Sequence, residues 1–565
     1  MEETRNYEEA ARALSRRDLF KGAGLVGATA IFGAALTGCA NEGTAEGSAP
    51  IATTADVEWA RETDIVVLGM GMAGLSAAIT ASRAGAQTLV LEKSSEEDSG
   101  GNSRVSGNIW CVATDEEAGL EYAINCASRI ADQDTVEYVT EFMKAGMTLN
   151  DDFLIDFDMD IVELPGVYAP EHPGVEHSDG CSVVYCANGT VGESALWDAL
   201  RVGLDECENV EVLYETPGLR LITNADGAVL GVVASEAGAE VNIKARKGVI
   251  LCTGGYEFNQ AMIENTYPVW PLCGRGTPYN TGDGHKMAQK VGADLWHMNC
   301  TQTGVGQMKV PGLDFGNGAY DSDEITTAVH FTVTEPTEGR LGVIHVNKHG
   351  KRFIAEDRPD RHSFGRREYL NWYDGIECEW PNLPFWVICD AATGEAGPLG
   401  TASNNESSKF SWFNAHSGYE WSEDNVPEVE RGWVLKANTL AELATQMGVE
   451  PADLEATVER YNAMAAAGND EDFGRAPELM VPLGAGPYYA VQVYPAIYNT
   501  QGGPKRNTKA QTLDPFGEPI PGLYNCGECG AGFGWVYNGG WNIAECCITG
   551  MWASTDAAAR DAWDA

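Results

Sequence analysis

The chain has 565 residues, of which 44% are hydrophobic, so it is long enough to bury several cores and is not disordered as a whole. The 83 Asp and Glu residues against 37 Lys and Arg give a formal net charge of -46. A charge of that sign repels polyphosphate backbones and anionic membrane surfaces, which argues against nucleic acid as a partner. The 65 Gly, 15 Trp and 20 Tyr residues favour close backbone approaches and large apolar or aromatic pockets.

The N-terminus has the layout of an export signal. Arg16 and Arg17 precede a weakly apolar run at residues 22–36, which is too short to span a bilayer of about 30 Å. The paired arginines predict twin-arginine export, and a basic helix cap is the alternative. The residues before Cys39 resemble a lipobox, so a lipid anchor at Cys39 and cleavage at an ordinary small-residue site both stay open. We therefore expect an exported protein of the cell envelope, with a signal at 1–40 and a flexible linker at 41–61.

An apolar, β-branched run at residues 63–68 leads into a glycine-rich turn, and residues 75–86 have helical composition and spacing. Such a strand, turn and helix predict a dinucleotide-binding unit whose helix N-terminus faces the phosphates. The pattern G-x-G-x-x-G needs its glycines for the tight turn, for backbone approach to a pyrophosphate and for close helix packing. The residues expected to contact the cofactor here are Gly69, Gly71, Ala73 and Gly74.

A carboxylate completes this pattern. A second strand at residues 88–91 ends in Glu92, at the distance from the glycines where an acidic residue accepts the ribose hydroxyls of a dinucleotide. A surface Glu after an ordinary βα unit is the alternative. Only one dinucleotide motif is evident in the sequence, which argues against soluble NAD(P)H as the electron donor.

Further segments resemble a family of FAD enzymes, the fumarate reductase and 3-ketosteroid dehydrogenase superfamily of flavoprotein alkene reductases. The matching segments follow the family's order and are residues 100–107, 248–256, 282–293, 346–353 and 522–528. The resemblance implies FAD as cofactor. The additional residues that it implies as FAD contacts are Gly101, Asn102, Ser103, Gly107, Thr253, Gly254, Gly255, Asp283, Glu528, Asn542 and Ile543.

The same resemblance implies an α/β fold with a Rossmann-like FAD-binding domain that is split in sequence. An inserted α+β capping domain would close over the flavin. We expect the FAD-binding domain at residues 62–298 and 494–565, and the capping or substrate domain at 299–493. Pro, Gly and Trp-rich stretches in the capping domain indicate irregular, loop-rich structure.

The substrate site departs from the fumarate reductase pattern. In that family two histidines and an arginine hold the substrate carboxylates. This sequence has Tyr498 and Asn499 where one histidine belongs, Thr303 near the position of the other, and Tyr537 near the arginine position. A small dicarboxylate would therefore lose charge-assisted hydrogen bonds of roughly 1.5 to 3 kcal/mol each.

The aromatic residues at these positions favour a different substrate. Tyr498, Tyr537 and Trp541 suggest a bulky, mostly apolar molecule whose carbonyl is polarised by a phenol, as a tyrosine does in ketosteroid dehydrogenases. Tyr537 matches that tyrosine in position. Core packing of these aromatic side chains is the alternative.

The resemblance also implies an arginine that donates a proton opposite the flavin. The family's position aligns with Asp360, so we expect one of the flanking arginines to serve, Arg361 first and Arg358 second. Because arginine is ordinarily locked in its protonated form, it needs a relay that reprotonates it at once. Candidates for that relay are Glu338, Arg340 and Glu356. A solvated loop crossed by surface ion pairs is the alternative.

The chain has 15 Cys, which is many for an enzyme of this size. Four of them lie near the C-terminus, at Cys526, Cys529, Cys546 and Cys547. Four sulfurs could bind a [4Fe–4S] cluster that feeds electrons to the flavin, although their spacing matches no common ferredoxin motif. A structural role as thiols or disulfides is the alternative.

Together these features predict an exported FAD-dependent reductase of an activated C=C bond. The substrate would be an enone or unsaturated lactone on a bulky, steroidal molecule, so that the site resembles that of cardiac glycoside reductases. Electrons would come from a membrane cytochrome or quinol, as in anaerobic respiration. Three alternatives stay open: a 3-ketosteroid-type desaturase, a respiratory reductase of a small acid such as fumarate, urocanate or cinnamate, and a non-catalytic flavoprotein.

Overall fold

The computed structural model describes most of the chain after the linker. The described residues are 57–126, 133–163, 175–189, 194–267, 269, 272–274, 276–308, 329–330, 342–356, 372–399, 421–534 and 538–563. The predicted signal and most of the predicted linker lie outside these residues.

The largest sheet has a parallel centre. Strand β1 (Arg61–Leu68) pairs in parallel with β2 (Thr88–Leu91) on one side and β9 (Ala239–Leu251) on the other. The other strands of this sheet are β6 (Val210–Leu213), β7 (Gly218–Thr223), β8 (Val229–Glu236), β19 (Gln511–Leu513) and β20 (Pro519–Asn525). The order is β19-β20-β9-β1-β2-β6, and an antiparallel hairpin of β7 and β8 pairs with β9. The predicted α/β class with a parallel sheet is confirmed.

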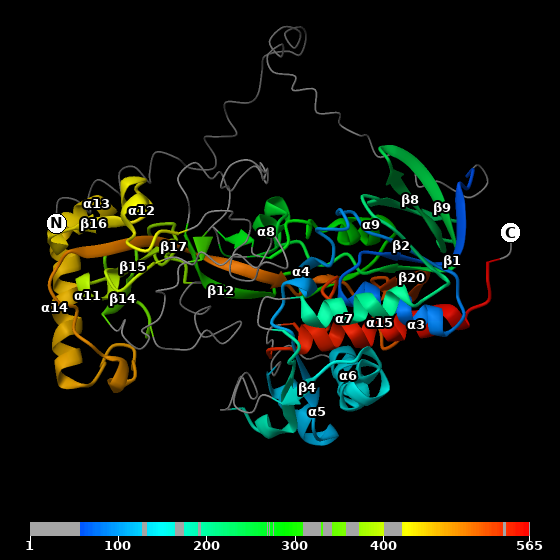
Figure 1. Cartoon of the computed structure of the whole chain (residues 1–565), viewed down its shortest axis with the longest axis horizontal. Helices are drawn as coiled ribbons and strands as arrows, with labels where there is room; N and C mark the ends of the chain where they lie inside the picture. The colour runs from blue at the N-terminus through cyan, green and yellow to red at the C-terminus, as the bar shows by residue number, and fades with distance from the viewer. Residues whose placement is uncertain are drawn as a thin grey trace, which may run out of the picture. The chain divides into compact units, whose positions relative to one another are not determined.

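Both faces of β1 are buried, as a central parallel strand requires. Ile65 and Val67 pack into a core with α3 (Met72–Arg83), α7 (Ala195–Asp205) and α15 (Trp541–Ala559). Val66 and Leu68 pack on the other face with residues of β8, β9 and α9 (Asp283–Lys290). Figure 1 shows α3, α7 and α15 lying alongside one another on one face of this sheet.

A second sheet is centred on the long strand β17 (Tyr488–Thr500). Its other strands are β10 (Cys273–Gly274), β12 (Thr301–Met308), β13 (Val329–His330), β14 (Val343–Val346), β15 (Phe385–Cys389) and β16 (Leu435–Ala437). Helices α11 (Ala391–Gly394) and α12 (Val426–Glu430) lie between β15 and β16 in the chain, and α13 (Leu440–Met447) and α14 (Pro451–Ala467) follow β16. Helix α13 begins at a capping box between Thr439 and Glu442, and α14 begins with Pro451 at its first position, which needs no N–H donor there.

A small antiparallel sheet completes the architecture, in the order β3-β5-β4. Its strands are β3 (Ile109–Ala113), β4 (Ile161–Glu163) and β5 (Cys181–Cys186), and a separate two-stranded pair consists of β11 (Leu295–Trp296) and β18 (Gly503–Pro504). The remaining α-helices are α4 (Gly101–Arg104), α5 (Glu116–Cys126), α6 (Gln133–Asp152) and α8 (Gln260–Thr266). Short 3-10 helices lie at Leu154–Phe157, Ser178–Gly180 and Pro477–Leu479.

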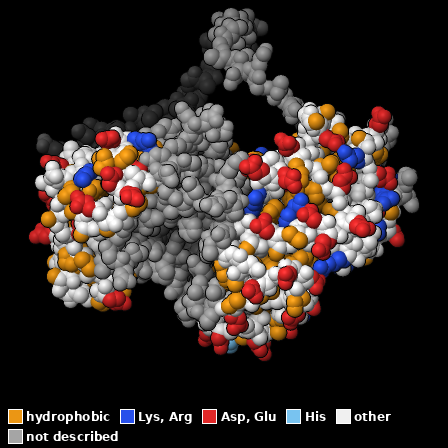
Figure 2. Space-filling model, in the orientation of Figure 1, with side chains coloured by type: hydrophobic (Ala, Val, Ile, Leu, Met, Phe, Trp, Pro, Cys, Tyr) orange, Lys and Arg blue, Asp and Glu red, His pale blue; other side chains and the backbone are white. Residues whose placement is uncertain are grey.

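The surface reflects the excess of acidic residues. Figure 2 shows Asp and Glu side chains scattered over the described part of the visible face, with fewer Lys and Arg between them. Among the described residues, no helix combines the length and apolarity that crossing a membrane requires.

Candidate active site

The glycine-rich turn joins β1 to α3 in the conformation that its sequence predicts. Gly69 has φ +100°, a left-handed value that other residues rarely adopt, and a Cβ there would clash with the carbonyl oxygen of Cys252. A Cβ at Gly74 would clash with the carbonyl oxygen of Gly69. Glycine at these two positions therefore lets the turn lie against the end of β9 and lets α3 pack close to the turn.

The N-terminus of α3 is suited to an anion. The helix has 12 residues, Gly71 at its N-cap makes no side-chain cap, and its first turn contains no acidic residue. Met72 N donates to Ser103 Oγ at 2.9 Å, and this hydrogen bond holds α4, which contains Ser103, at this end of the helix. The backbone N–H groups of such a turn carry partial positive charge, so a pyrophosphate group fits here.

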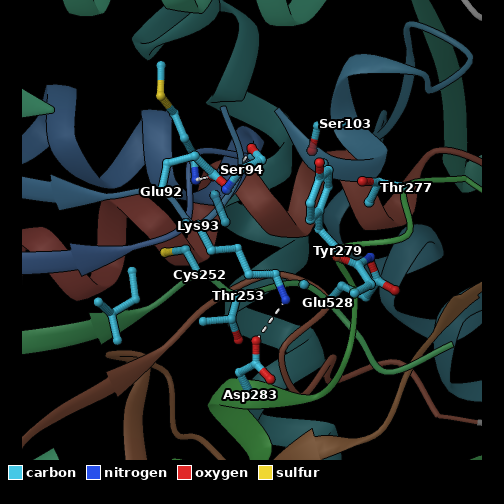
Figure 3. Close-up of a pocket in the computed structure, with 18 of the residues that line it drawn as sticks. Glu92, Lys93, Ser94, Ser103, Cys252, Thr253, Thr277, Tyr279, Asp283 and Glu528 are labelled. Carbon is cyan, nitrogen blue, oxygen red and sulfur yellow. Dashed lines mark hydrogen bonds and ion pairs between the residues drawn. The ribbon is translucent and has the colours of Figure 1, made fainter. Parts of the chain in front are cut away.

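Glu92 lies at the end of β2 beside this turn. One carboxylate oxygen accepts the Met70 N–H at 2.9 Å, and the other accepts the Ser94 N–H and hydroxyl, each at 2.8 Å. These contacts fix the carboxylate on the pocket wall, where it suits ribose hydroxyls. The neighbouring Lys93 Nζ pairs with Asp283 at 2.7 Å, as Figure 3 shows.

Two acidic residues meet near the ends of β9 and β20. Asn102 Nδ2 donates to Glu257 Oε1 at 2.8 Å and lies 3.4 Å from Glu528 Oε2. Asn280 Nδ2 also donates to Glu257 Oε1, at 2.7 Å, and Thr500 N donates to Glu528 Oε1 at 3.1 Å. Burial raises the pKa of Glu257 to about 7, and burial together with the neighbouring Glu257 raises the pKa of Glu528 well above its usual range.

One pocket brings together most of the predicted FAD contacts. The predicted residues that line it are Gly69, Gly71, Ala73, Glu92, Gly101, Asn102, Ser103, Thr253, Gly254, Asp283 and Glu528. The predicted residues that are not among its lining are Gly74, Gly107, Gly255, Asn542 and Ile543. Gly74 and Gly255 still shape the pocket, because a Cβ at either would clash with neighbouring groups. The glycine turn, the anion-binding helix end and the fixed carboxylate together fit FAD.

The predicted catalytic residues are only partly described. Arg358, Arg361 and Tyr537 lie outside the described residues. Tyr498 is described: it is 9% exposed, lies near the end of β17, and its backbone oxygen accepts the Asn102 amide at 3.1 Å. This hydrogen bond joins Tyr498 to a residue of the pocket wall.

Glu356, one of the predicted relay groups, is fully buried between two arginines. Arg352 Nη2 donates to it at 2.8 Å and Arg475 Nη1 at 3.4 Å, and the backbone N–H of His345 donates at 3.1 Å. These contacts fix the Glu356 side chain, so it anchors the chain just before the predicted acid arginines.

Trp541 belongs to the core. It is 1% exposed and stacks on Phe533 with ring centroids 4.5 Å apart, and its edge contacts Tyr122 at 6.0 Å. Of the aromatic residues expected near the substrate, Trp541 therefore follows the core-packing alternative.

The four C-terminal cysteines do not converge on one point. Cys526 Sγ donates to Thr549 O at 3.2 Å, whereas Cys529 Sγ accepts the Thr253 hydroxyl at 3.5 Å. Burial raises the pKa of Cys529 to about 11 and that of Cys547 to about 12, so these groups are protonated thiols. Across the described residues, no group of three or more His, Cys, Asp or Glu side chains could hold a metal ion. The predicted iron–sulfur cluster on Cys526, Cys529, Cys546 and Cys547 is not supported, and we do not retain it.

Several pocket residues were missed by reasoning from the sequence. They are Lys93, Asp98, Cys252, Thr277, Tyr279 and Asn280. Lys93 directly follows Glu92, so adjacency to a motif residue could have identified it. The Tyr279 hydroxyl donates to Asp98 at 3.3 Å. Burial, and to a smaller extent the negative charge of Asp98, raise the pKa of Tyr279 to about 12. Only the fold brings that pair together, because the two residues are far apart in the chain.

Several known proteins are similar to this chain along most of its length. The chain is 28% identical to digoxin reductase of Eggerthella lenta. The alignment is 590 positions long, gaps included, and covers 98% of each chain. Among solved structures, it matches a 3-ketosteroid delta1-dehydrogenase from Sterolibacterium denitrificans with a TM-score of 0.68 and 22% identity, over 88% of this chain and 100% of that chain. A flavocytochrome c3 fumarate reductase matches with a TM-score of 0.63 and 25% identity, over 88% and 78% of the two chains.

A family model provides the assignment. The model described as FAD binding domain matches residues 64–542, which include the glycine turn, the second sheet and the start of α15. The predicted superfamily and the predicted FAD cofactor are thus confirmed. The chain belongs to the FAD binding domain family, and it is an FAD-dependent oxidoreductase.

Proposed function

We propose that the protein reduces an activated C=C bond, in an enone or unsaturated lactone, on a bulky and steroidal substrate. The observation that carries this proposal is the similarity to digoxin reductase along nearly the whole of both chains. Digoxin is a steroid that bears an unsaturated lactone, so it has the two chemical features that the substrate site favours.

The residues near the end of β17 support the same substrate class. Tyr498 and Asn499 stand where a carboxylate-binding histidine would be expected, and both are neutral. Tyr498 is linked through Asn102 to the cofactor pocket. A neutral, aromatic surface there suits an apolar substrate with a carbonyl group. The negative charges of a small dicarboxylate would find no positively charged partner at these two residues.

In the proposed mechanism, residues of the chain bind the substrate, polarise its carbonyl group and protonate its α-carbon. When bound, FAD supplies the hydride that adds to the β-carbon of the alkene. A phenol of Tyr537 or Tyr498 donates a hydrogen bond to the substrate carbonyl and stabilises the negative charge that develops there. Arg361, or else Arg358, donates a proton to the α-carbon, and solvent-derived protons restore it.

The domain arrangement, the location and the electron donor complete the proposal. The split FAD-binding domain comprises residues 62–298 and 494–565, and residues 299–493 form the capping domain. The protein is exported through its twin-arginine signal to the cell envelope, where a lipid at Cys39 anchors it. A membrane cytochrome or quinol supplies the electrons, for which the acidic surface offers a docking face for a basic partner.

An anaerobic reoxidation assay tests the substrate class. The holoprotein is reduced chemically, and reoxidation of its flavin is followed with fumarate, urocanate, a cinnamate, an enone steroid and a butenolide steroid. We expect the steroids to reoxidise the flavin at least tenfold faster than the acids. Faster reoxidation by fumarate would contradict the proposal and favour a respiratory reductase of small acids. Inertness to every alkene would leave a non-catalytic flavoprotein.

A matched pair of variants tests the role of Tyr498. Tyr498→Phe removes the phenol, whereas Tyr494→Phe removes one from the same strand whose hydroxyl contacts Gln492 at 3.2 Å. Only Tyr498→Phe should slow reoxidation by the steroids. The second candidate, a ketosteroid desaturase, is favoured by the fold of the steroid dehydrogenase. That candidate requires the oxidised holoprotein to be reduced by a saturated 3-ketosteroid, and we expect this reduction to be slower than the reverse reaction.

A further inference from the structure

Two carboxyl groups beside the FAD pocket have no cationic partner among the residues that the structure describes. Glu257 is 2% exposed, and Glu528 is half-buried and lines the pocket. Their hydrogen-bond donors are the amides of Asn102 and Asn280 and the backbone N–H of Thr500, all of which are neutral. Among the described residues, no Lys or Arg side chain forms an ion pair with either carboxyl.

The two carboxyl groups also face each other. A Cβ at Gly255 would clash with both Glu528 Oε1 and Glu257 Oε2, and Asn102 Nδ2 lies within 3.4 Å of an oxygen of each group. Glu257 Oε2 is buried and receives no hydrogen bond from any other described group. Two ionised carboxylates only accept hydrogen bonds, so they cannot bond to each other unless one of them carries a proton.

We propose that Glu257 and Glu528 share one proton at neutral pH and form a proton-holding pair beside the FAD pocket. A proton between the carboxyls supplies the donor that Glu257 Oε2 lacks. It also removes one of two negative charges that burial would otherwise leave without compensation. When negative charge is added to the pocket, the pair takes up a second proton from solvent, and it releases that proton when the charge leaves.

The surrounding titratable groups do not take over this role. Tyr256 and Cys546 are near the pair, and burial raises the pKa of each well above neutral pH, so both stay uncharged. Lys93 and Asp283 line the same pocket but compensate each other at 2.7 Å. The pair is therefore suited to change its charge near neutral pH, which agrees with the raised pKa values of its members.

Glu257 and Glu528 have different tasks within the pair. Glu257 Oε1 accepts two amide donors at 2.8 and 2.7 Å, which stabilise negative charge there. Glu528 accepts one backbone N–H at 3.1 Å and a longer contact from Asn102 at 3.4 Å. The shared proton accordingly resides on Glu528, the member that lines the pocket. Both act as positioning residues for charge near the cofactor, independently of which alkene is the substrate.

Proton counting on the FAD holoprotein tests the pair. Its midpoint potential is measured from about pH 6 to about pH 9, and the slope gives the number of protons taken up per two-electron reduction by dithionite. We expect the wild type to take up about one proton more than Glu257→Gln over part of this range. Glu428→Gln is the matched control, since Glu428 is also buried but its carboxylate accepts from Ser422 at 2.9 Å and does not line the pocket.

An infrared titration of the wild type needs no variant. We expect a protonated carboxyl band that persists at about pH 8, above the pKa of Glu257, and that is lost there in Glu528→Gln but not in Glu428→Gln. Equal proton counts in the wild type and Glu257→Gln would overturn the proposal, as would the absence of the carboxyl band. Neither readout involves a substrate, so failure here and failure of the proposed alkene reduction can be told apart.

Discussion

Buried acidic residues occur in two regions of this molecule, with opposite surroundings. Beside the second sheet, Glu356 and Asp470 contact two arginines, with Arg352 donating to Glu356 at 2.8 Å and to Asp470 at 3.0 Å. At the FAD pocket, the hydrogen-bond donors to Glu257 and Glu528 within the described part of the chain are neutral amide and backbone groups. In the first region arginine side chains pair with the carboxylates, and in the second we propose that a shared proton takes the place of such a cation. A buried Glu side chain thus stabilises the fold in the first region, whereas in the second region we propose that it binds and releases a proton.

The largest effect is expected where the charges are compensated. Glu356→Gln would leave Arg352 and Arg475 buried with half of their negative partners, and breaking a buried pair costs about 3–5 kcal/mol. We expect the free energy of unfolding, measured with urea, to fall by that amount. Glu459→Gln on the exposed side of α14 is the control and should change it by less than about 0.5 kcal/mol. Equal effects of the two variants would show that the arginines do not depend on Glu356.

A smaller effect of opposite sign is expected at the FAD pocket. Burial raises the pKa of Glu257 from 4.5 to about 7, so between these values the folded protein binds more protons than the unfolded chain. The free energy of unfolding should therefore decrease as the pH rises from about 4.5 to about 7 and stay low above that range. Glu257→Gln removes this loss and should stabilise the protein by up to about 3 kcal/mol at about pH 8.

Urea unfolding of the wild type and Glu257→Gln at a series of pH values measures this effect. The two curves should converge at the acidic end, where Glu257 is protonated in both the folded and the unfolded state. Destabilisation by Glu257→Gln at every pH would mean that the carboxylate is compensated after all, as in the region of Arg352.

The smallest effect is expected for an ion pair that is partly exposed. Lys93 and Asp283 are 2.7 Å apart, with side chains 25% and 36% exposed, so solvent screens their attraction. A double-mutant cycle of Lys93→Gln and Asp283→Asn should give a coupling energy below about 1 kcal/mol, and added salt should reduce it further. A coupling energy near that of the Arg352 cluster would remove the distinction between exposed and buried pairs.

Local patterns account for the predicted residues that the structure brings together at the pocket. Gly69, Gly71 and Glu92 follow from one strand–turn–helix unit and the next strand, whose geometry is fixed within a short stretch of chain. The pairing of Glu257 with Glu528 did not follow, because the two residues come from different strand ends and meet only through the parallel pairing of β9 with β20. The cysteines near the C-terminus show that closeness in sequence does not guarantee a common site. Cys526 and Cys529 are three residues apart, but their sulfur atoms form hydrogen bonds with different residues, Thr549 and Thr253.

Strand β17 runs from the part of the second sheet near α13 and α14 to the FAD pocket, with a bulge at Tyr498 in its pairing with β12. Tyr489 pairs with Cys389 and Lys436 near one end, and at the other end the Thr500 N–H donates to Glu528 while its hydroxyl accepts the Tyr256 N–H at 3.0 Å. An extended strand can hardly be shortened along its axis, since its backbone is already near full length. A shift of the second sheet along β17 would therefore be transmitted toward the Glu528 hydrogen bond, which makes this strand a mechanical link between the second sheet and the pocket.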